Sequence, residues 1–143
     1  ERAGRLPAGD LVRLCFSGRY TERELIRRLT SGGGLVAHLG TRDWREVEKR
    51  IAAGDGEARL VYQAMAYQVA KEIGAMAVAL RARADAVVLT GDLAHSRLLT
   101  DWITGWVDWI APVLRFPGSE ENRALAAGAL RVLRGEEEAR TYA

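Results

Sequence analysis

The sequence predicts an α/β fold that is rich in helices and has few parallel strands. Two short apolar runs, residues 86–89 and 113–116, are each followed by a segment with helical periodicity. A strand–helix–strand–helix order is typical of parallel strands joined by crossover helices. The 143 residues are 48% hydrophobic and 28% charged. This ordinary globular mixture argues against disordered, collagen-like and low-complexity proteins.

Capping residues and glycines divide the first forty residues into short helices. Asp10 is placed to cap a helix over 11–17. Thr21 and Glu24 have the spacing of a capping box, which begins a second helix. The glycines 32–34 then act as a helix stop. They lack the Gly-Lys-Ser/Thr ending of a phosphate loop, so that interpretation is set aside.

The middle of the chain predicts one long central helix. Residues 35–40 are too short a run to assign to strand or loop. Asp43 is positioned to cap a helix over 44–53, and a glycine-containing break follows. The next helix, about residues 57–81, is apolar on most of its faces, so we expect it to be buried.

The last third predicts the strands and two further helices. Residues 86–89 form a continuous apolar run of the kind seen in a strand buried on both faces. A helix over 94–110 follows, then a strand over 113–116 and a helix over 120–134. Three tryptophans at helical spacing predict a packing face on the first of these helices, and they are Trp102, Trp106 and Trp109.

Charge and cysteine content argue against two classes of protein and indicate a cellular compartment. Lys and Arg total 21 against 19 for Asp and Glu, and neither half has the basic stripe that nucleic-acid binding requires. Lys71 and Glu72 interrupt the apolar run 60–80, which argues against a membrane span. Cys15 is the one cysteine, and no apolar leader opens the chain, so we expect a reducing cytoplasm.

The best local candidate for chemistry is the segment 88–96. An apolar strand ends at Thr90 and Gly91, and a helix begins three or four residues later. Ligands in open α/β sheets gather at the carboxyl ends of strands. A glycine there also lets a sugar or phosphate approach the backbone closely. The alternative is a tight turn that needs glycine only for its dihedral angles.

Residues 40–45 are a second candidate. Asp43 could cap a helix while Arg42 and Arg45 face a phosphate or stack on a base. The alternative is an ordinary capped helix with solvated arginines. His38 and His95 have no partners at metal-ligand spacing, so a His/Cys metal site is not expected.

Four segments together resemble the butyrate kinases, which belong to the acetate kinase group of the acetate and sugar kinase, heat-shock chaperone and actin superfamily. They are residues 9–18 (GDLVRLCFSG), 33–41 (GGLVAHLGT), 64–76 (AMAYQVAKEIGAM) and 89–96 (LTGDLAHS). The resemblance spans nearly the whole chain. It implies an ATP-dependent carboxylate kinase, which exchanges phosphate between ATP and a short-chain fatty acid with magnesium.

The resemblance also implies a domain organisation. Residues 1–143 would be the later part of the second, nucleotide-binding domain, which has a ribonuclease-H-like, actin-like fold. The first domain, the opening strands of the second and the catalytic residues would precede Glu1, so no catalytic residue is assigned within this chain. We expect the parent enzyme to be a homo-oligomer, and the isolated segment to be inactive and to leave apolar surface or a sheet edge uncovered.

Carried over by position, the family's nucleotide contacts fall on two segments. The adenosine-contacting turn would comprise Gly91, Asp92, Leu93, Ala94 and His95, extending to Ser96. Near the base and ribose would lie Thr41, Asp43 and Arg45, and the magnesium-assigned glutamate aligns with Glu120.

One residue departs from the family pattern, which has two glycines after the strand where this chain has Gly91 and Asp92. A carboxylate near phosphates is repulsive, although Asp92 could instead point at a ribose hydroxyl. Two alternatives follow. One is that the chain is part of an acetate or propionate kinase, and the other is that it is a non-catalytic, truncated domain that serves as a packing or oligomerisation module.

Overall fold

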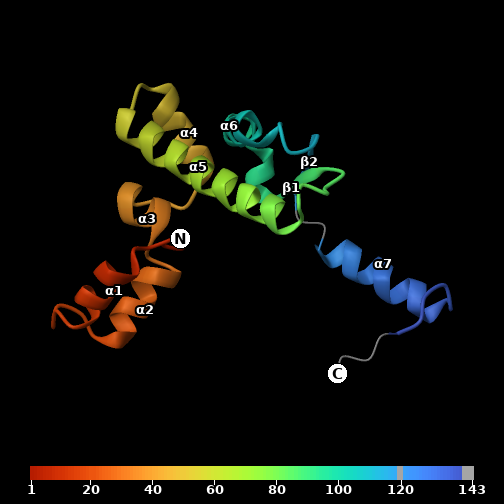
Figure 1. Ribbon diagram of the computed structural model, residues 1–143, viewed down its shortest axis with the longest axis horizontal. Helices are drawn as coiled ribbons and strands as arrows, with labels where there is room; N and C mark the ends of the chain where they lie inside the picture. The colour runs from red at the N-terminus through yellow and green to blue at the C-terminus, as the bar shows by residue number, and fades with distance from the viewer. Residues whose placement is uncertain (119–120, 140–143) are drawn as a thin grey trace.

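Several helices pack on one long helix, a small parallel sheet lies near the end of that helix, and further helices extend away from it (Figure 1). The computed structural model describes residues 1–118 and 121–139. In chain order the elements are α1 (Ala8–Cys15), α2 (Glu22–Thr30), α3 (Gly34–Leu39), α4 (Trp44–Ala52), α5 (Gly56–Ala79), β1 (Val87–Gly91), the 3₁₀ helix η1 (Asp92–His95), α6 (Arg97–Val107), β2 (Val113–Pro117) and α7 (Glu121–Leu133).

The core lies along one side of α5. Small residues at helical spacing on this helix let α4 and α6 pack closely, and Tyr62 fills the space between them with no exposed surface. Val47 of α4 and Ile103 of α6 complete this centre. The prediction that the long helix is central is therefore confirmed. Its opposite side is open, however, because Leu60 and Val78 are 67% and 78% exposed.

The two predicted strands are present and pair in parallel. Val87 lies opposite Val113, and the register continues to Gly91 opposite Pro117. Within the described residues, β1 and β2 form the whole sheet. The expectation of burial on both faces is wrong for β1. Val87 and Leu89 pack toward the core, whereas Val88 is 54% exposed.

Local capping signals in the first half are confirmed with one correction. Thr21 and Glu24 form the capping box of α2, with the Thr21 N–H donating to Glu24 Oε2 at 2.8 Å. The side chain of Asp43 caps α4 by accepting the Arg45 N–H at 2.9 Å. Helix α1, in contrast, begins at Ala8, so Asp10 lies in its first turn and does not cap it.

The glycines at 32–34 do more than end α2. The N-terminal segment crosses directly over them, and the Gly33 N–H donates to the Glu1 carbonyl at 2.6 Å. A Cβ on Gly33 would lie 2.7 Å from the Ala3 Cα, which is too close for any side chain. Helix α3 starts at this crossing, so the unassigned run 35–40 is largely helical.

The predicted helix over 94–110 is two elements. The chain first makes the short helix η1, and α6 then begins after Ser96, whose hydroxyl accepts the Leu99 N–H at 2.9 Å. The tryptophan packing face is only partly correct. Trp102 packs on the core, whereas Trp106 and Trp109 are 57% and 72% exposed.

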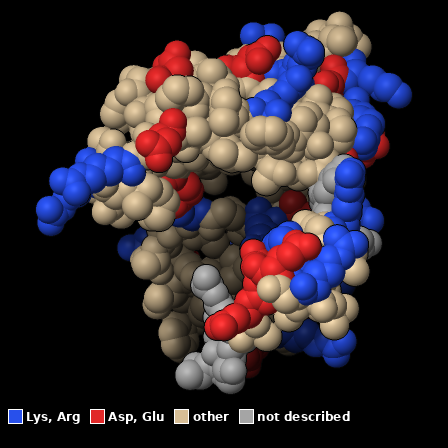
Figure 2. Space-filling view, turned by 90° about the vertical axis from the view of Figure 1, so that its right-hand side faces the viewer, with Lys and Arg blue, Asp and Glu red and all other residues tan. Residues whose placement is uncertain are grey.

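The surface carries both charges and uncovered apolar groups. On the face in Figure 2, Lys and Arg are interspersed with Asp and Glu. The thiol of Cys15 is exposed. Helix α7 stands away from the other elements (Figure 1). Among the residues that the structure describes, no helix is both long and apolar enough to cross a membrane.

Candidate functional site

The two candidate segments, 40–45 and 88–96, meet at one corner of the structure. The indole Nε1–H of Trp44 donates to Asp92 Oδ2 at 2.9 Å. The guanidinium of Arg45 donates to Asp92 Oδ1 at 3.3 Å. These two contacts join the first turn of α4 to the first residue of η1. The predicted turn and the predicted Asp43–Arg45 loop therefore lie side by side.

Gly91 forms the corner by a conformation that suits glycine. Its φ is +88°, and a Cβ placed there would meet no atom within 4 Å, so the space in front of it is open. Gly118, after β2, has a φ of +100° and faces it. The two glycines exchange backbone hydrogen bonds of 3.0 and 3.2 Å. The corner is thus built from two adjacent strand ends, where α/β sheets collect ligands.

Asp92 occupies this corner without strain. It lies in η1 with an ordinary negative φ, so the backbone does not require a second glycine. The hydrogen bond from Trp44 and the charge of Arg45 hold the pKa of its carboxyl below the usual range, against a smaller opposing effect of desolvation. The carboxylate is therefore ionised and turned toward α4. This orientation lets the turn accommodate a side chain where the family pattern has a second glycine.

The other predicted residues of the loop support its shape. Thr41 donates to Glu46 Oε2 at 2.7 Å and accepts the Asp43 N–H at 3.1 Å. Asp43 caps α4 and lies 3.8 Å from the Arg45 guanidinium. Both side chains thus make local contacts, and of the three predicted residues Thr41, Asp43 and Arg45 it is Arg45 that reaches the turn.

The remaining turn residues differ in their access to the corner. Leu93 and His95 are exposed, and the His95 Nε2 lies 3.7 Å from where a Cβ on Gly118 would be. Ala94 is 3% exposed, so its side chain is buried and holds the turn against the rest of the protein.

A buried polar cluster supports the corner from below. The Ser96 hydroxyl donates to Glu48 of α4 and accepts from the Tyr62 hydroxyl at 3.2 Å. Burial raises the pKa of Tyr62 to about 12, so its hydroxyl remains a donor at neutral pH. Helices α4, α5 and α6 therefore meet in one hydrogen-bonded cluster directly under the turn.

Two residues that contact this corner were not predicted from the sequence. Trp44 is one of them, since nothing in a single sequence shows that its indole N–H reaches residue 92. Gly118 follows Pro117 at a strand end, and that pair is a turn signal that could have drawn attention to it. Glu120 lies outside the described residues. Among the described ones, no three His, Cys, Asp or Glu side chains cluster as metal ligands would.

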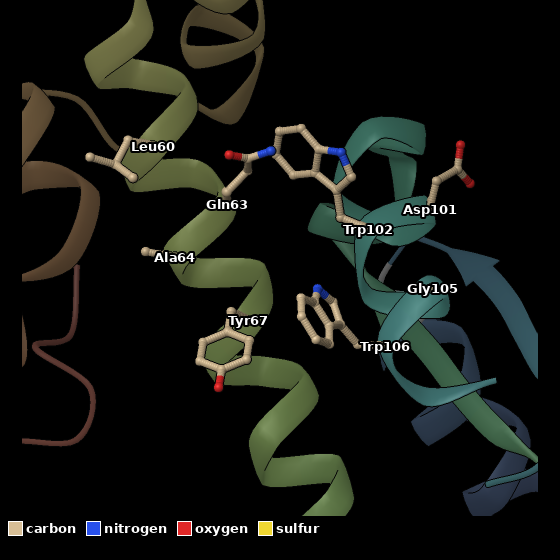
Figure 3. Close-up of a pocket in the computed structure, with 8 residues that line it drawn as sticks. All are labelled: Leu60, Gln63, Ala64, Tyr67, Asp101, Trp102, Gly105 and Trp106. Atoms are coloured by element: carbon tan, nitrogen blue, oxygen red, sulfur yellow. The ribbon is translucent and has the colours of Figure 1, made fainter. Parts of the chain in front are cut away.

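A separate hollow of about 520 Å³ lies between α5 and α6, away from this corner (Figure 3). The ring of Tyr67 stands edge-on to that of Trp106, with centroids 5.2 Å apart. The side chain of Gln63 reaches toward Trp102 across the same hollow. Its walls are mainly aromatic and apolar, and it carries no charged group other than Asp101.

Comparisons with known proteins agree with this architecture. A model of the acetokinase family matches residues 2–97. Butyrate kinase 2 from Clostridium acetobutylicum is 50% identical over 142 residues, which is 99% of this chain and 40% of that protein. The chain therefore spans about two-fifths of the length of this curated relative.

Two solved structures share the fold. The crystal structure of Porphyromonas gingivalis acetate kinase superposes with a TM-score of 0.80 and 19% identity, over 92% of this chain and 39% of that one. A propionate kinase from Francisella tularensis subsp. tularensis SCHU S4 gives a TM-score of 0.70 and 19% identity, over 84% and 37%. At this identity the likeness concerns the fold alone. It supports the predicted class, a helix-rich portion of the α/β fold of these kinases.

Proposed function

This chain belongs to the acetokinase family, and from that premise we propose that it forms the nucleotide-binding part of a butyrate kinase. The protein that contains it would transfer phosphate between ATP and a short-chain fatty acid, giving ADP and an acyl phosphate. The relative that is 50% identical over nearly the whole chain favours butyrate over acetate or propionate as substrate. Acetate and propionate remain the alternative substrates.

The meeting of Trp44 and Arg45 with the Gly91 turn is the observation that carries this proposal. The corner combines an open glycine backbone with a planar cation that lies 4.5 Å above an aromatic ring. Backbone groups next to glycine can approach a ribose or phosphate, and an arginine stacked on tryptophan offers a flat surface for a base. Such a corner suits the nucleoside end of ATP or ADP.

The rest of the reaction is assigned to residues outside this chain. Phosphoryl transfer depends on positioning and on neutralising charge in the transition state. The corner has the means to position a nucleoside, whereas we propose that the acyl pocket and the catalytic groups belong to the first domain and the opening strands of the second. Magnesium would enter as the ion of the ATP complex. We place the enzyme in the cytoplasm and expect it to act as a homo-oligomer.

Calorimetric titration with ADP tests the proposal directly. The protein should bind ADP, and Gly91→Ala should weaken binding because a side chain at a φ of +88° is strained. Gly105→Ala is the matched control, since it adds the same methyl group to open space on α6. An ADP affinity that is unchanged in Gly91→Ala, or absent in the starting protein, would contradict a nucleotide site at this corner.

Activity is measured separately by trapping acyl phosphate with hydroxylamine. The full-length enzyme should form it from ATP and butyrate faster than from acetate, whereas residues 1–143 alone should form none. Product from the isolated chain would show that catalytic groups lie within it. The remaining alternative is a non-catalytic packing module, and the exposed Trp106 and Trp109 favour it. This alternative would be supported if neither the full-length enzyme nor residues 1–143 bind ADP.

A further inference from the structure

We propose that Asp92 is a positioning residue, which locks the Trp44–Arg45 pair against the Gly91 turn before a nucleotide arrives. The inference rests on the proposed nucleotide site and adds a specific role for the residue that departs from the family's paired glycines. Its carboxylate holds Trp44 at 2.9 Å through one oxygen and Arg45 at 3.3 Å through the other. Among the residues that the structure describes, no other side chain of η1 forms a hydrogen bond or an ion pair with α4.

A surface ion pair alone would not carry this role, because exposed pairs seldom order their side chains. Asp92 and Arg45 have side chains that are 64% and 54% exposed. Trp44 changes this balance, since its ring packs against the core and presents its N–H in a fixed direction. The Arg45 guanidinium also lies over the same ring, 4.5 Å from its centroid. The three groups therefore hold one another in place.

This arrangement matters for binding because ordering a long side chain costs conformational entropy. If Arg45 is already held flat beside the turn, a nucleotide does not have to order it on arrival. The carboxylate also has acceptor positions left, since two of about four are occupied. Its charge disfavours phosphate at the same spot. Asp92 therefore selects the uncharged nucleoside end of the ligand for this corner.

Two probes separate positioning from simple repulsion. Adenosine lacks phosphates, whereas ADP carries them. If Asp92 positions Trp44 and Arg45, Asp92→Ala should weaken the binding of adenosine and of ADP by a similar factor, about three- to tenfold. If the carboxylate only repels phosphate, Asp92→Ala should tighten the binding of ADP and leave the affinity for adenosine unchanged. The second result would overturn the inference.

The experiment is calorimetry with both ligands on four single variants and one double variant. Asp92→Asn keeps the shape and should lose less affinity than Asp92→Ala, because an amide oxygen can still accept from Trp44. Trp44→Phe keeps a ring and removes the N–H, so it should lose affinity while adding little in combination with Asp92→Ala. Asp101→Ala removes an exposed carboxylate on α6 and should change neither ligand.

The lock is also visible without any ligand. The indole N–H resonance of Trp44, identified by its disappearance in Trp44→Phe, should shift when Asp92 becomes Ala or Asn. Starting protein that binds neither probe would overturn the proposed function as well as this inference. Starting protein that binds both, with Asp92→Ala unchanged in affinity or in the Trp44 resonance, would overturn the inference alone.

Discussion

At the scale of single residues, the buried hydroxyl cluster under the turn is the most exacting feature of the structure. Ser96 accepts from the Leu99 N–H and from Tyr62 while it donates to Glu48. A buried polar group that loses its partner retains the cost of leaving water. Removing any member of this cluster should therefore lower the free energy of unfolding, although none of them contacts the open corner.

Tyr62→Phe should lower the free energy of unfolding by about 1 kcal/mol, because it removes one hydrogen bond in the core and keeps the ring. Urea unfolding measures the difference. Tyr67→Phe, five residues along the same helix and 46% exposed, is the control and should leave stability unchanged. Equal effects of the two substitutions would show that the Tyr62 hydroxyl contributes nothing specific.

Asp55 should make stability depend on acid pH. It caps α5 by accepting the Ala58 N–H and pairs with Arg50 at 2.8 Å, and these contacts lower the pKa of its carboxyl from 3.8. A lowered pKa contributes stability above the unfolded value and loses it as pH falls through the folded one. Asp55→Asn should therefore be less stable than the starting protein at pH 7.

The stability gap between the two proteins should narrow as pH falls below the unfolded value of 3.8, and it should close once pH passes the lower folded pKa, where the native carboxyl becomes protonated. Urea midpoints at pH 7 and pH 3 provide the comparison. Asp108→Asn, at the end of α6, is the control substitution. A gap between Asp55→Asn and the starting protein that is the same at both pH values would argue against a charge effect.

At the scale of elements, close backbone crossings decide where helices can start. The N-terminal segment lies on Gly33 and Gly34, and two backbone hydrogen bonds hold it there, from Gly33 to Glu1 and from Ala3 to Leu29. A composition rule treats these glycines as a helix stop. The structure shows that they also make room for another stretch of chain.

Gly33→Ala should displace residues 1–3 and cost about 1–3 kcal/mol, because the new Cβ would lie 2.6 Å from the Ala3 N. Hydrogen exchange should show loss of protection at the Ala3 amide. Gly32→Ala is the matched control, since its Cβ would lie at an ordinary 3.5 Å from its nearest neighbours. Retained protection at Ala3 in Gly33→Ala would contradict the crossing.

At the scale of the whole molecule, apolar surface remains uncovered at the sheet and along α5. A hollow of about 370 Å³ follows β1, with Val69 and Leu93 in its walls, and Val88 is exposed on the strand itself. Within the described residues β1 pairs only with β2, so one of its edges carries unpaired backbone groups. Open edges and apolar patches promote association.

Sedimentation should accordingly show that residues 1–143 associate in a concentration-dependent way. Val88→Lys should reduce that association by placing a charge on the open strand. Leu125→Lys, on the exposed face of α7, is the control and should have little effect. A monodisperse monomer at every concentration would show that this surface drives no assembly.

Prediction from sequence succeeded where the signal was local. The capping box at Thr21, the cap at Asp43 and the two apolar strands depend on neighbours within a few residues, and each is present. It failed where burial depends on distant partners. Trp106 and Val88 have the residue types of a core, yet in the part of the chain that the structure describes they remain 57% and 54% exposed.

The amino-acid order by itself determined most of the helices, the parallel strand pair and the two segments of the candidate site, because periodicity, caps and family motifs are written along the chain. Only the tertiary structure decided that these segments touch. Asp92 meets Trp44 and Arg45 across 48 and 47 residues. That meeting is set by how α4 and α6 pack on α5, and packing is a property of three-dimensional shape that no local pattern contains.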